Sequence, residues 1–272
     1  MKRTLLIDAD IVNYKFASAT EEVYYFDGKD QPPAVHHDTK EACDAAEAYI
    51  EDLRSKLGAA HVVICLTDRG NEFRKDFWPA YKGNRKGRKP ADLFNVEAHL
   101  ASKYETYKRP RLEADDCMGI LSTHPSLIPG ERIIVSEDKD MASVPGLLFN
   151  PAKDDEPRRI SKLAANRMHM VQTITGDQVD NYPGAPFVGP KSPEVAAVME
   201  EKTVEGMWRH VLAAFERGWK RADPEAPPEV ARQMAVIMAR CARILRSSDW
   251  NFSQKKPILW TPFFPGQGSY PA

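Results

Sequence analysis

Short apolar runs alternate with helical patterns in the first half of the chain. Three of these runs contain few polar residues, as is typical of central strands in a parallel sheet that is covered on both faces. They are "TLLID" at 4–8, "HVVICLT" at 61–67 and "RIIVS" at 132–136. Between the first two runs, apolar residues recur at helical spacing and predict a helix over 39–57, with Thr39 as its cap and Gly58 at its end.

Further periodic segments extend this pattern. We expect helices over 92–107 and 115–124 and, after Pro151, over 161–174, 193–201, 204–219 and 229–245. Strands that alternate with helices predict an α/β fold, with a central, mostly parallel sheet flanked by helices. We expect this core over residues 1–155 and a helical part over 156–272. The two parts need not be independent domains.

Composition narrows the class of protein only a little. The 272 residues carry a net charge of −1, with 42% hydrophobic and 28% charged residues, which is ordinary for a soluble globular protein. The four cysteines lack CxxC spacing and favour neither a zinc site nor a disulfide framework, so we expect a reducing compartment. The start "MKRTLLIDADIV" is too charged for a signal peptide, and no 18-residue apolar run is present. We therefore expect a cytoplasmic protein without a membrane partner.

Carboxylates gather where predicted strands end and helices begin. The set comprises Asp8 and Asp10, then Asp68, then Glu113, Asp115 and Asp116, then Asp138 and Asp140, and after a later helix Asp177 and Asp180. The carboxyl ends of parallel strands converge on one crevice, where ligands bind. So many carboxylates in one crevice repel one another unless cations are bound. Each acid alone is equally well explained as a helix cap or a surface turn, but the set as a whole favours a metal site.

The ligand type and number indicate which metals bind. Oxygen ligands without nearby His or Cys select Mg²⁺ or Mn²⁺ over zinc. The carboxylates suffice for two ions about 4 Å apart, as in many sites that cleave phosphodiesters. In "SEDKD", Asp138 and Asp140 are two residues apart and would share one side if the strand geometry continued. Glu137 would then be a bystander.

A basic segment follows Asp68 directly. Residues 69–90 hold eight Lys and Arg against two acids, together with four aromatic residues. Basic side chains neutralise phosphates, and aromatic rings stack on single-stranded bases. A solvated surface is the plainer explanation of the charges, but the aromatic residues and the adjacent carboxylates favour a site that cuts a polyanion. Lys82 and Arg85, at i and i+3, are expected on one helical face directed at the scissile phosphate.

Several motifs together resemble the flap-endonuclease/5′→3′ exonuclease family over residues 3–262. They are "LIDAD", "TDRG", "FRKDFWPAYKGNR", "LEADD", "SEDKDM" and "TGDQVDNYPGAPFVGPK", in this order. The tail "ARILRSSDWNFSQKKPILWTP" further resembles the short phage exonucleases of this family. The resemblance implies hydrolysis of phosphodiesters near 5′ ends of DNA with two Mg²⁺ or Mn²⁺ ions, in phage DNA replication or recombination. The resemblance also implies RNA primers in RNA–DNA hybrids as substrates and replication proteins as partners.

The resemblance also implies roles for individual residues. One metal cluster would comprise Asp8, Asp68, Glu113 and Asp115, and the other Asp116, Asp138, Asp140, Asp177 and Asp180. Lys82 and Arg85 would contact the reacting phosphate from a helical arch, and Tyr81 would stack on a base. The residues expected to bind DNA are Arg74, Lys75, Tyr81, Lys86, Arg88 and Lys89, with Gly184, Gly189 and Lys191 in a helix–three-turn–helix near 174–200.

That turn departs from the family at one position. Phe187 stands between Gly184 and Gly189 where the family has glycine, and a side chain there would obstruct the approach of backbone to phosphate. A K⁺ ion, which often occupies this turn in the family, is therefore less expected here. Lys191 remains available for a phosphate, and "SPE" at 192–194 is a good helix start.

Three other functions share part of this pattern. A haloacid-dehalogenase-type phosphatase would use Asp8 as nucleophile and Asp10 as acid/base, with Thr67 and Asp177 in supporting roles, but it explains neither "EADD" nor the basic segment. A non-catalytic DNA-binding module explains the basic segment but leaves the carboxylates repelling the same DNA. A PIN-type ribonuclease shares the acidic chemistry but lacks the basic arch.

Overall fold

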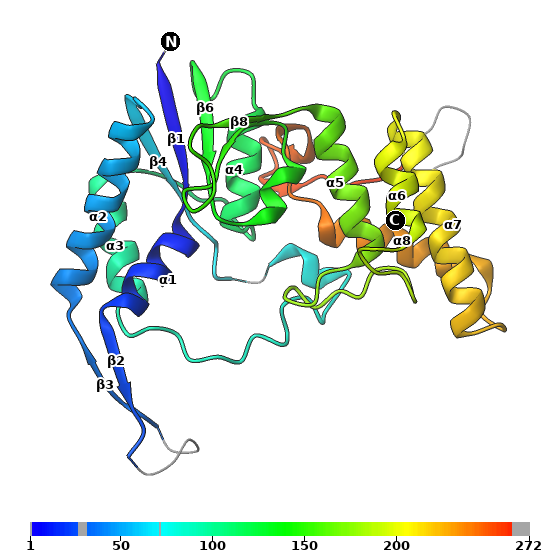
Figure 1. The fold of residues 1–272 in the computed structure, drawn as a ribbon, viewed down its shortest axis with the longest axis horizontal. Helices are drawn as coiled ribbons and strands as arrows, with labels where there is room; N and C mark the ends of the chain where they lie inside the picture. The colour runs from blue at the N-terminus through cyan, green and yellow to red at the C-terminus, as the bar shows by residue number, and fades with distance from the viewer. Residues whose placement is uncertain (1, 27–31, 71, 263–272) are drawn as a thin grey trace.

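A six-stranded sheet forms the centre of the computed structural model, which describes residues 2–26, 32–70 and 72–262. The strand order is β5-β4-β1-β6-β7-β8, and every neighbouring pair is parallel except β7 with β8. The strands are β1 (Arg3–Asp8), β4 (His61–Cys65), β5 (Glu105–Tyr107), β6 (Glu131–Val135), β7 (Gly146–Phe149) and β8 (Arg158–Ile160). The predicted α/β fold with a mostly parallel sheet is confirmed (Figure 1).

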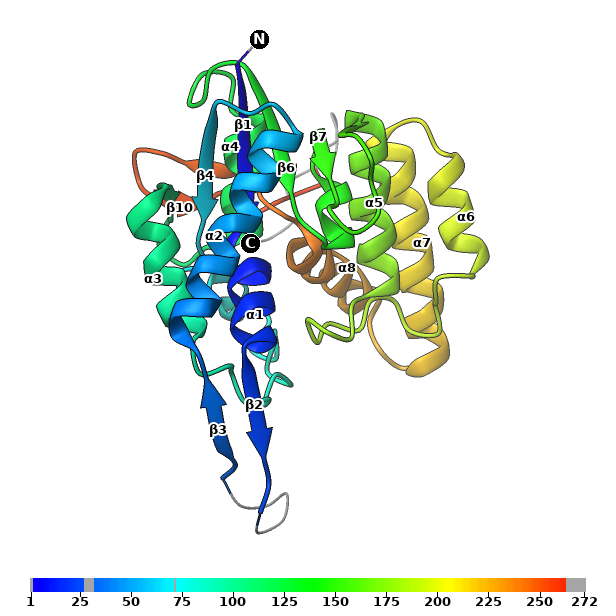
Figure 2. The same ribbon diagram turned by 60° about the vertical axis from the view of Figure 1, so that its left-hand side comes forward.

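Side-chain alternation along the strands divides the core in two. Leu5 of β1 joins a cluster under α1 (Ala9–Ala19), α2 (Thr39–Lys56) and α3 (Leu93–Lys103), of which α2 crosses in front of the sheet in Figure 2. Leu6 points to the opposite face, where α4 (Ala114–Thr123) covers it. Burial on both faces explains why the central strands are continuous apolar runs.

Two predicted helix boundaries in this part are wrong. Asp38, not Thr39, caps α2, because its side chain accepts the Glu41 N–H at 2.9 Å whereas the Thr39 hydroxyl donates to Asp92. The helix predicted over 92–107 ends at Lys103, and the chain then forms the edge strand β5 along β4. The pattern did not predict α1 or the hairpin of β2 (Glu21–Tyr24) and β3 (Ala34–His37), which projects from the body of the protein (Figure 2).

Four helices form the second part of the protein. They are α5 (Lys162–Thr175), α6 (Pro193–Glu200), α7 (Val204–Ala222) and α8 (Pro228–Ala242) (Figure 1). Trp208 and Phe215 are fully buried in the core that they enclose. Helix α8 ends three residues earlier than predicted, because residues 243–246 run extended to the α/β core, where the Leu245 N–H donates to Asp116. The short η3 (Ser247–Asp249) and the β9 (Trp250–Asn251) and β10 (Lys256–Pro257) pair follow.

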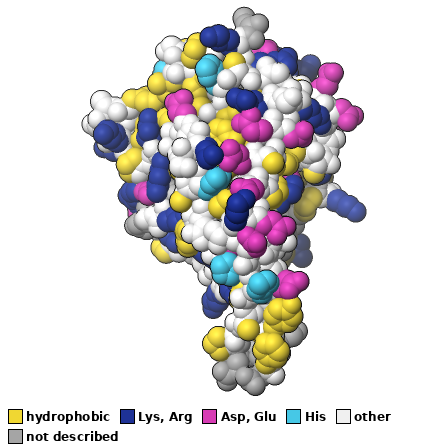
Figure 3. Space-filling view, turned by 90° about the vertical axis from the view of Figure 1, so that its left-hand side faces the viewer, with side chains coloured by type: hydrophobic (Ala, Val, Ile, Leu, Met, Phe, Trp, Pro, Cys, Tyr) yellow, Lys and Arg dark blue, Asp and Glu magenta, His cyan; other side chains and the backbone are white. Residues whose placement is uncertain are grey.

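The outer face over α2 and α3 carries no patch of a single charge. Lys and Arg alternate there with Asp and Glu, and hydrophobic side chains gather on the projecting hairpin (Figure 3). Among the described residues, no helix combines the length and hydropathy that crossing a membrane requires.

Candidate active site

A cleft of about 1230 Å³ opens at the carboxyl ends of β1, β4 and β6. The basic segment and the loop after α5 form its other walls. Eight of the nine carboxylates expected to bind metal line it: Asp8, Asp68, Glu113, Asp115, Asp138, Asp140, Asp177 and Asp180. Asp10, which the strand-end pattern included but the ligand set did not, lines the same cleft. The convergence expected from parallel strand ends is therefore present.

Asp8 lies at the buried end of β1, where it caps α1 by accepting the Ile11 N–H at 3.3 Å. Burial and the neighbouring Asp10 carboxylate raise the pKa of Asp8 to about 7. Asp115, in the first turn of α4, has a pKa well above its ordinary value because of burial and the proximity of Asp8 and Asp138. This crowding of negative charge is the state that a bound cation relieves.

Asp138 and Asp140 reach the cleft by a different geometry from the one predicted. The strand ends at Val135, and Lys139–Ser143 form a 3₁₀ helix (η2) that Asp138 caps by accepting the Asp140 N–H at 2.7 Å. Strand alternation therefore does not place the two aspartates. Burial and Asp138 raise the pKa of Asp140 to about 6.

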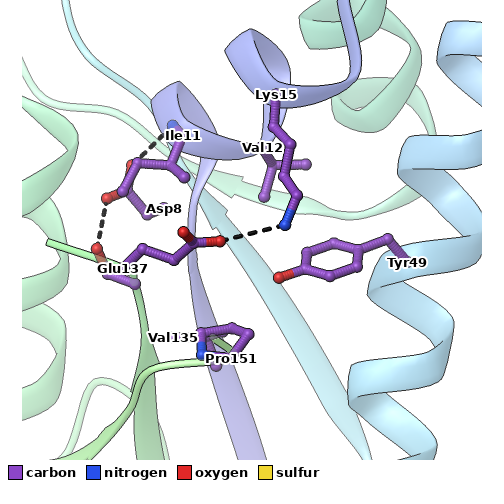
Figure 4. A pocket seen from close by; sticks show the side chains of 9 residues that line it. Asp8, Ile11, Val12, Lys15, Tyr49, Val135, Glu137 and Pro151 are labelled. Atoms are coloured by element: carbon purple, nitrogen blue, oxygen red, sulfur yellow. Dashed lines mark hydrogen bonds and ion pairs between the residues drawn. The ribbon is translucent and has the colours of Figure 1, made fainter. Parts of the chain in front are cut away.

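Glu137 pairs with Lys15 of α1 at 3.2 Å (Figure 4). This pair lies beside a cavity of about 10 Å³ near Tyr49, whose ring lies under the Lys15 ammonium. Glu137 also lines the cleft, so its place as a bystander among the metal ligands stays a prediction.

Cations stand beside the carboxylates on the other side of the cleft. Glu113 accepts hydrogen bonds from Lys82 and from the Tyr81 hydroxyl. Burial acts to raise the pKa of Glu113, but Lys82 and Arg74 hold it below its ordinary value. Asp68 accepts the Arg111 N–H at 2.8 Å, and this bond lowers its pKa.

The loop after α5 carries the remaining two acids. Lys139 Nζ lies 2.9 Å from Asp177 and 2.8 Å from Asp140, so it joins η2 to this loop. Arg85 Nη2 lies 2.6 Å from Asp180 Oδ1, so the two side chains form an ion pair. Together with Lys82, these cations and carboxylates form a mixed lining along one wall of the cleft.

Asp116, expected in the second metal cluster, is the one of the nine proposed ligands that does not line the cleft. Its carboxylate is completely buried and accepts two hydrogen bonds from Arg74, at 2.9 and 2.8 Å. Arg74 was expected to bind DNA, but it is 2% exposed and also donates to Glu72 and to the carbonyls of Cys241 and Arg243. Glu72, Glu113 and Asp116 thus gather around one guanidinium, which offsets part of their charge, and burial raises the pKa of Glu72 to about 7.

The basic segment is not the helical arch that was expected. Within its described residues it forms only the 3₁₀ turn η1 (Phe73–Asp76) and a run of turns, as Pro79, Gly83 and Gly87 would lead one to expect. Lys82 has φ of +53° and donates its backbone N–H to the Asp180 carbonyl. Lys82 and Arg85 therefore share no helical face, yet both side chains reach Asp180, at 3.7 and 2.6 Å.

The aromatic ring that is exposed in the cleft is not the one that the sequence predicted. Tyr81 is 2% exposed, and its ring packs within the helical core near Tyr182, so it is not accessible to a base. Tyr14 on α1, which sequence reasoning missed, lines the cleft and is 54% exposed. An isolated tyrosine next to "LIDAD" carries no signal until α1 is known to border the cleft. Lys75, Arg88 and Lys89 also line the cleft, whereas Lys86 is exposed outside its lining.

The turn between α5 and α6 is held by two close glycines. Gly176 and Gly184 have φ of +68° and +70°, and a Cβ on Gly184 would lie 2.4 Å from the Gly176 nitrogen. Phe187 adopts φ of +64°, a conformation that favours glycine, and its ring is 62% exposed beneath the Arg221 guanidinium. The Gly189 N–H donates to Ser192 Oγ, and Lys191 is exposed.

The donor set suits hard divalent cations. The lining offers carboxylate oxygens and, among the described residues, neither a histidine nor a free thiolate, since Cys241 is protonated by its raised pKa of about 12. Burial first, and a neighbouring carboxylate second, raise the pKa values of Asp8 and Asp140, and a bound cation would oppose both effects. The residues present therefore fit Mg²⁺ or Mn²⁺.

Comparison with known proteins agrees with this site. The chain is 29% identical to the exodeoxyribonuclease of Enterobacteria phage T3, over 96% of this chain and 93% of that protein. It is 28% identical to the exonuclease of Escherichia phage T7, over 96% and 94%. A flap endonuclease of bacteriophage T5, solved with DNA and metal ions, shares the fold with a TM-score of 0.53 at 15% identity, covering 89% of this chain and 99% of that one.

A family model gives the classification. The 5′-3′ exonuclease N-terminal resolvase-like domain matches residues 3–147, which is more than half of the chain and includes six of the eight expected metal ligands that line the cleft. This match decides against the phosphatase and the non-catalytic DNA-binding module. The chain belongs to the 5′-3′ exonuclease family.

Proposed function

We propose that this protein is a metal-dependent 5′ nuclease that hydrolyses phosphodiester bonds near 5′ ends of DNA, as exonuclease and as flap endonuclease. The observation that carries the proposal is the cleft itself, where eight of the expected metal ligands lie together with Lys82 and Arg85. Cutting a polyanion requires carboxylates that hold divalent cations and, next to them, Lys or Arg side chains that bind phosphate.

The carboxylates divide into two groups for two divalent cations. Asp8, Asp68, Glu113 and Asp115 would hold one, and Asp138, Asp140, Asp177 and Asp180 the other, some of them through water. Asp116 is left out because Arg74 occupies its carboxylate. When bound, such ions polarise a phosphate and lower the pKa of an attacking water.

Side chains of the cleft supply the remaining chemistry. The Lys82 ammonium and the Arg85 guanidinium would stabilise the charge that develops on the phosphate during hydrolysis. Both now pair with Asp180, so they lie within reach of a phosphate placed at the carboxylates. Exposed Tyr14 would stack on the terminal base, and Lys75, Arg88 and Lys89 would neutralise neighbouring phosphates.

The turn between α5 and α6 would hold the duplex away from the cleft. Lys191 and Arg221 are exposed cations beside it, and Arg221 is held over the Phe187 ring at 4.2 Å. We extend the proposal to RNA–DNA hybrids as substrates and to phage DNA replication or recombination in the cytoplasm of an infected cell, since the T3 and T7 relatives are phage exonucleases.

Release of label from 5′-labelled duplex and 5′-flap DNA tests the proposal. We expect Mg²⁺-dependent release that EDTA abolishes and that Asp138→Ala reduces by roughly three orders of magnitude or more, since loss of a metal ligand removes most of the catalysis. Asp52→Ala, an exposed acid on α2 outside the cleft lining, is the matched control and should behave as wild type. Release that persists in EDTA would contradict the proposal.

A further inference from the structure

Two hydroxyls flank the carboxyl end of β1. In the sheet, β1 lies between β4 and β6, so the residues that follow those two strands stand on either side of Asp8 and Asp10. Thr67 follows β4, and Ser136, which is 3% exposed, follows β6 directly. The sequence did not single out Ser136, and it suggested Thr67 only as the hydroxyl of the phosphatase alternative, because a Ser or Thr at the end of a strand is common.

Each hydroxyl makes the same pair of hydrogen bonds. Ser136 Oγ donates to Asp8 Oδ2 at 2.8 Å and accepts the Asp138 N–H at 3.1 Å. Thr67 Oγ1 donates to Asp10 Oδ2 at 2.6 Å and accepts the Ala114 N–H at 2.9 Å. A hydroxyl has one proton to donate, so each proton is committed to a carboxylate while a lone pair holds a backbone amide.

These bonds connect segments that carry different carboxylates. Ser136 joins Asp8 to the first residue of the Asp138–Asp140 pair. Thr67 joins the start of α1 to the start of α4, where Ala114 lies between Glu113 and Asp115. The hydroxyls are thus tied to both the β1 end and the neighbouring acidic segments, over sequence separations of 128 and 47 residues.

A hydroxyl that bonds both a carboxylate and a backbone amide helps to fix the distance between the carboxylates that bind metal. Two cations about 4 Å apart require carboxylates that are fixed relative to one another, and crowded carboxylates tend to move apart. A hydroxyl that donates to one carboxylate also favours its charged form, as Ser136 does for Asp8. Hydrogen bonds to metal-binding carboxylates typically affect metal affinity or activity by about 10–100-fold.

We propose that Ser136 and Thr67 are positioning residues that set the distance between the carboxylates of the cleft for divalent cations. The inference rests on the metal site proposed above. Ser136 acts between the two carboxylate groups, because Asp8 belongs to one and Asp138 to the other. Thr67 acts on the first group from one side, because it holds the backbone between Glu113 and Asp115, whereas its carboxylate partner Asp10 belongs to neither group.

Substitutions that remove only the hydroxyl test this role. Ser136→Ala and Thr67→Val preserve the volume of the side chain closely, and Ser136→Thr and Thr67→Ser restore the hydroxyl. Ser122→Ala is the matched control, since Ser122 is buried on α4 and donates to the Gly119 carbonyl at 3.3 Å, away from the cleft. The measurements are Mn²⁺ affinity by calorimetry without DNA, kcat and KM on 5′-flap DNA, the Mg²⁺ concentration for half-maximal rate, and Tm in EDTA.

We expect Ser136→Ala and Thr67→Val to weaken Mn²⁺ binding and to lower kcat by roughly tenfold or more, with KM for DNA unchanged. Ser136→Thr and Thr67→Ser should recover most of the Mn²⁺ affinity and most of kcat. Ser122→Ala should lose neither Mn²⁺ affinity nor kcat. A purely structural role would lower Tm without this split between kcat and KM and without recovery by the hydroxyl variants.

Two results would overturn the inference in different ways. Mn²⁺ affinity in Ser136→Ala and Thr67→Val equal to that of wild type would overturn the inference alone. Absence of Mn²⁺ binding to the wild type, or binding unchanged in Asp138→Asn, would overturn the metal site and the inference with it. A loss of affinity that Ser122→Ala shares would indicate general destabilisation and would also count against the hydroxyls.

Discussion

Arg74 and Asp116 form a two-point ion pair inside the protein. Nη1 of Arg74 lies 2.9 Å from Oδ2 of Asp116, and Nη2 lies 2.8 Å from Oδ1. Asp116 also accepts the Leu245 N–H at 3.0 Å, and Arg74 also donates to the Arg243 carbonyl. The pair therefore holds the basic segment, the start of α4 and the returning C-terminal segment together.

Breaking this pair on one side should destabilise the fold. Arg74→Met leaves the Asp116 carboxylate buried without its partner, which costs about 3–5 kcal/mol in free energy of unfolding. Urea denaturation measures the change. Arg74→Met combined with Asp116→Leu should recover much of the loss, because no buried charge remains unpaired. Wild-type stability of Arg74→Met alone would show that the pair contributes little.

The same pair predicts the role of Asp116 toward metal. Asp116→Asn should bind Mn²⁺ as tightly as the wild type once the protein is folded, because the carboxylate does not line the cleft. Calorimetry at a temperature well below the variant's Tm is the measurement, with Asp115→Asn as the comparison that loses affinity. A loss in Asp116→Asn as large as in Asp115→Asn would return Asp116 to the metal ligands.

Removing the cleft cations should slow the chemical step. Lys82→Ala and Arg85→Ala are each expected to lower kcat roughly a hundredfold, because preorganised donors stabilise charge that develops in the transition state. Single-turnover rates on 5′-flap DNA measure this step. Lys86→Ala removes a neighbouring exposed cation outside the cleft lining and should change kcat little. Equal losses in all three variants would indicate a general electrostatic effect.

The exposed ring of Tyr14 should contribute to substrate binding. Stacking on one base is worth about 1–3 kcal/mol, so Tyr14→Ala should raise KM or Kd for DNA by roughly tenfold. Tyr14→Phe keeps the ring and should remain close to wild type. Phe252→Ala is the control: its ring is 40% exposed, meets His124 edge-on and does not line the cleft. Fluorescence anisotropy with labelled flap DNA in Ca²⁺ provides the measurement.

Phe187 should decide whether a K⁺ ion assists binding to duplex DNA. Phe187→Gly suits the φ of +64° and removes the ring from the turn, so we expect DNA binding that becomes stronger in K⁺ than in Na⁺ at equal ionic strength. The wild type should bind equally in both salts. Arg221→Ala should weaken binding by the wild type in both salts. A K⁺ preference already present in the wild type would show that Phe187 does not obstruct the site.

His169 should make stability depend on pH. Burial lowers its pKa well below the ordinary value near 6.5, and its Nε2 lies 2.8 Å from the Ala239 carbonyl. The unfolded chain then takes up a proton that the folded protein does not, so the stabilisation is complete above about pH 6.5 and falls by up to about 1.4 kcal/mol per pH unit below it. Urea denaturation of His169→Gln between pH 7.5 and 5 should show a smaller fall than the wild type. His61→Gln, at an exposed position, should not.

The sequence by itself determined the architecture and the location of the site. Continuous apolar runs predict a parallel sheet, and carboxylates that follow such strands must converge because the strand ends share one edge. Asp8, Asp68 and Asp138 lie at or after the ends of β1, β4 and β6 and line the cleft for this reason, while their role as metal ligands stays a prediction.

Only the tertiary structure decided which neighbours those residues meet. Asp116 turns to Arg74 instead of the cleft, and Tyr81 packs into the helical core, because segments distant in sequence close around them. The hydroxyls of Thr67 and Ser136 matter only because β1 lies between the strands that precede them. Local periodicity contains no information on such contacts, which arise when separate elements pack together.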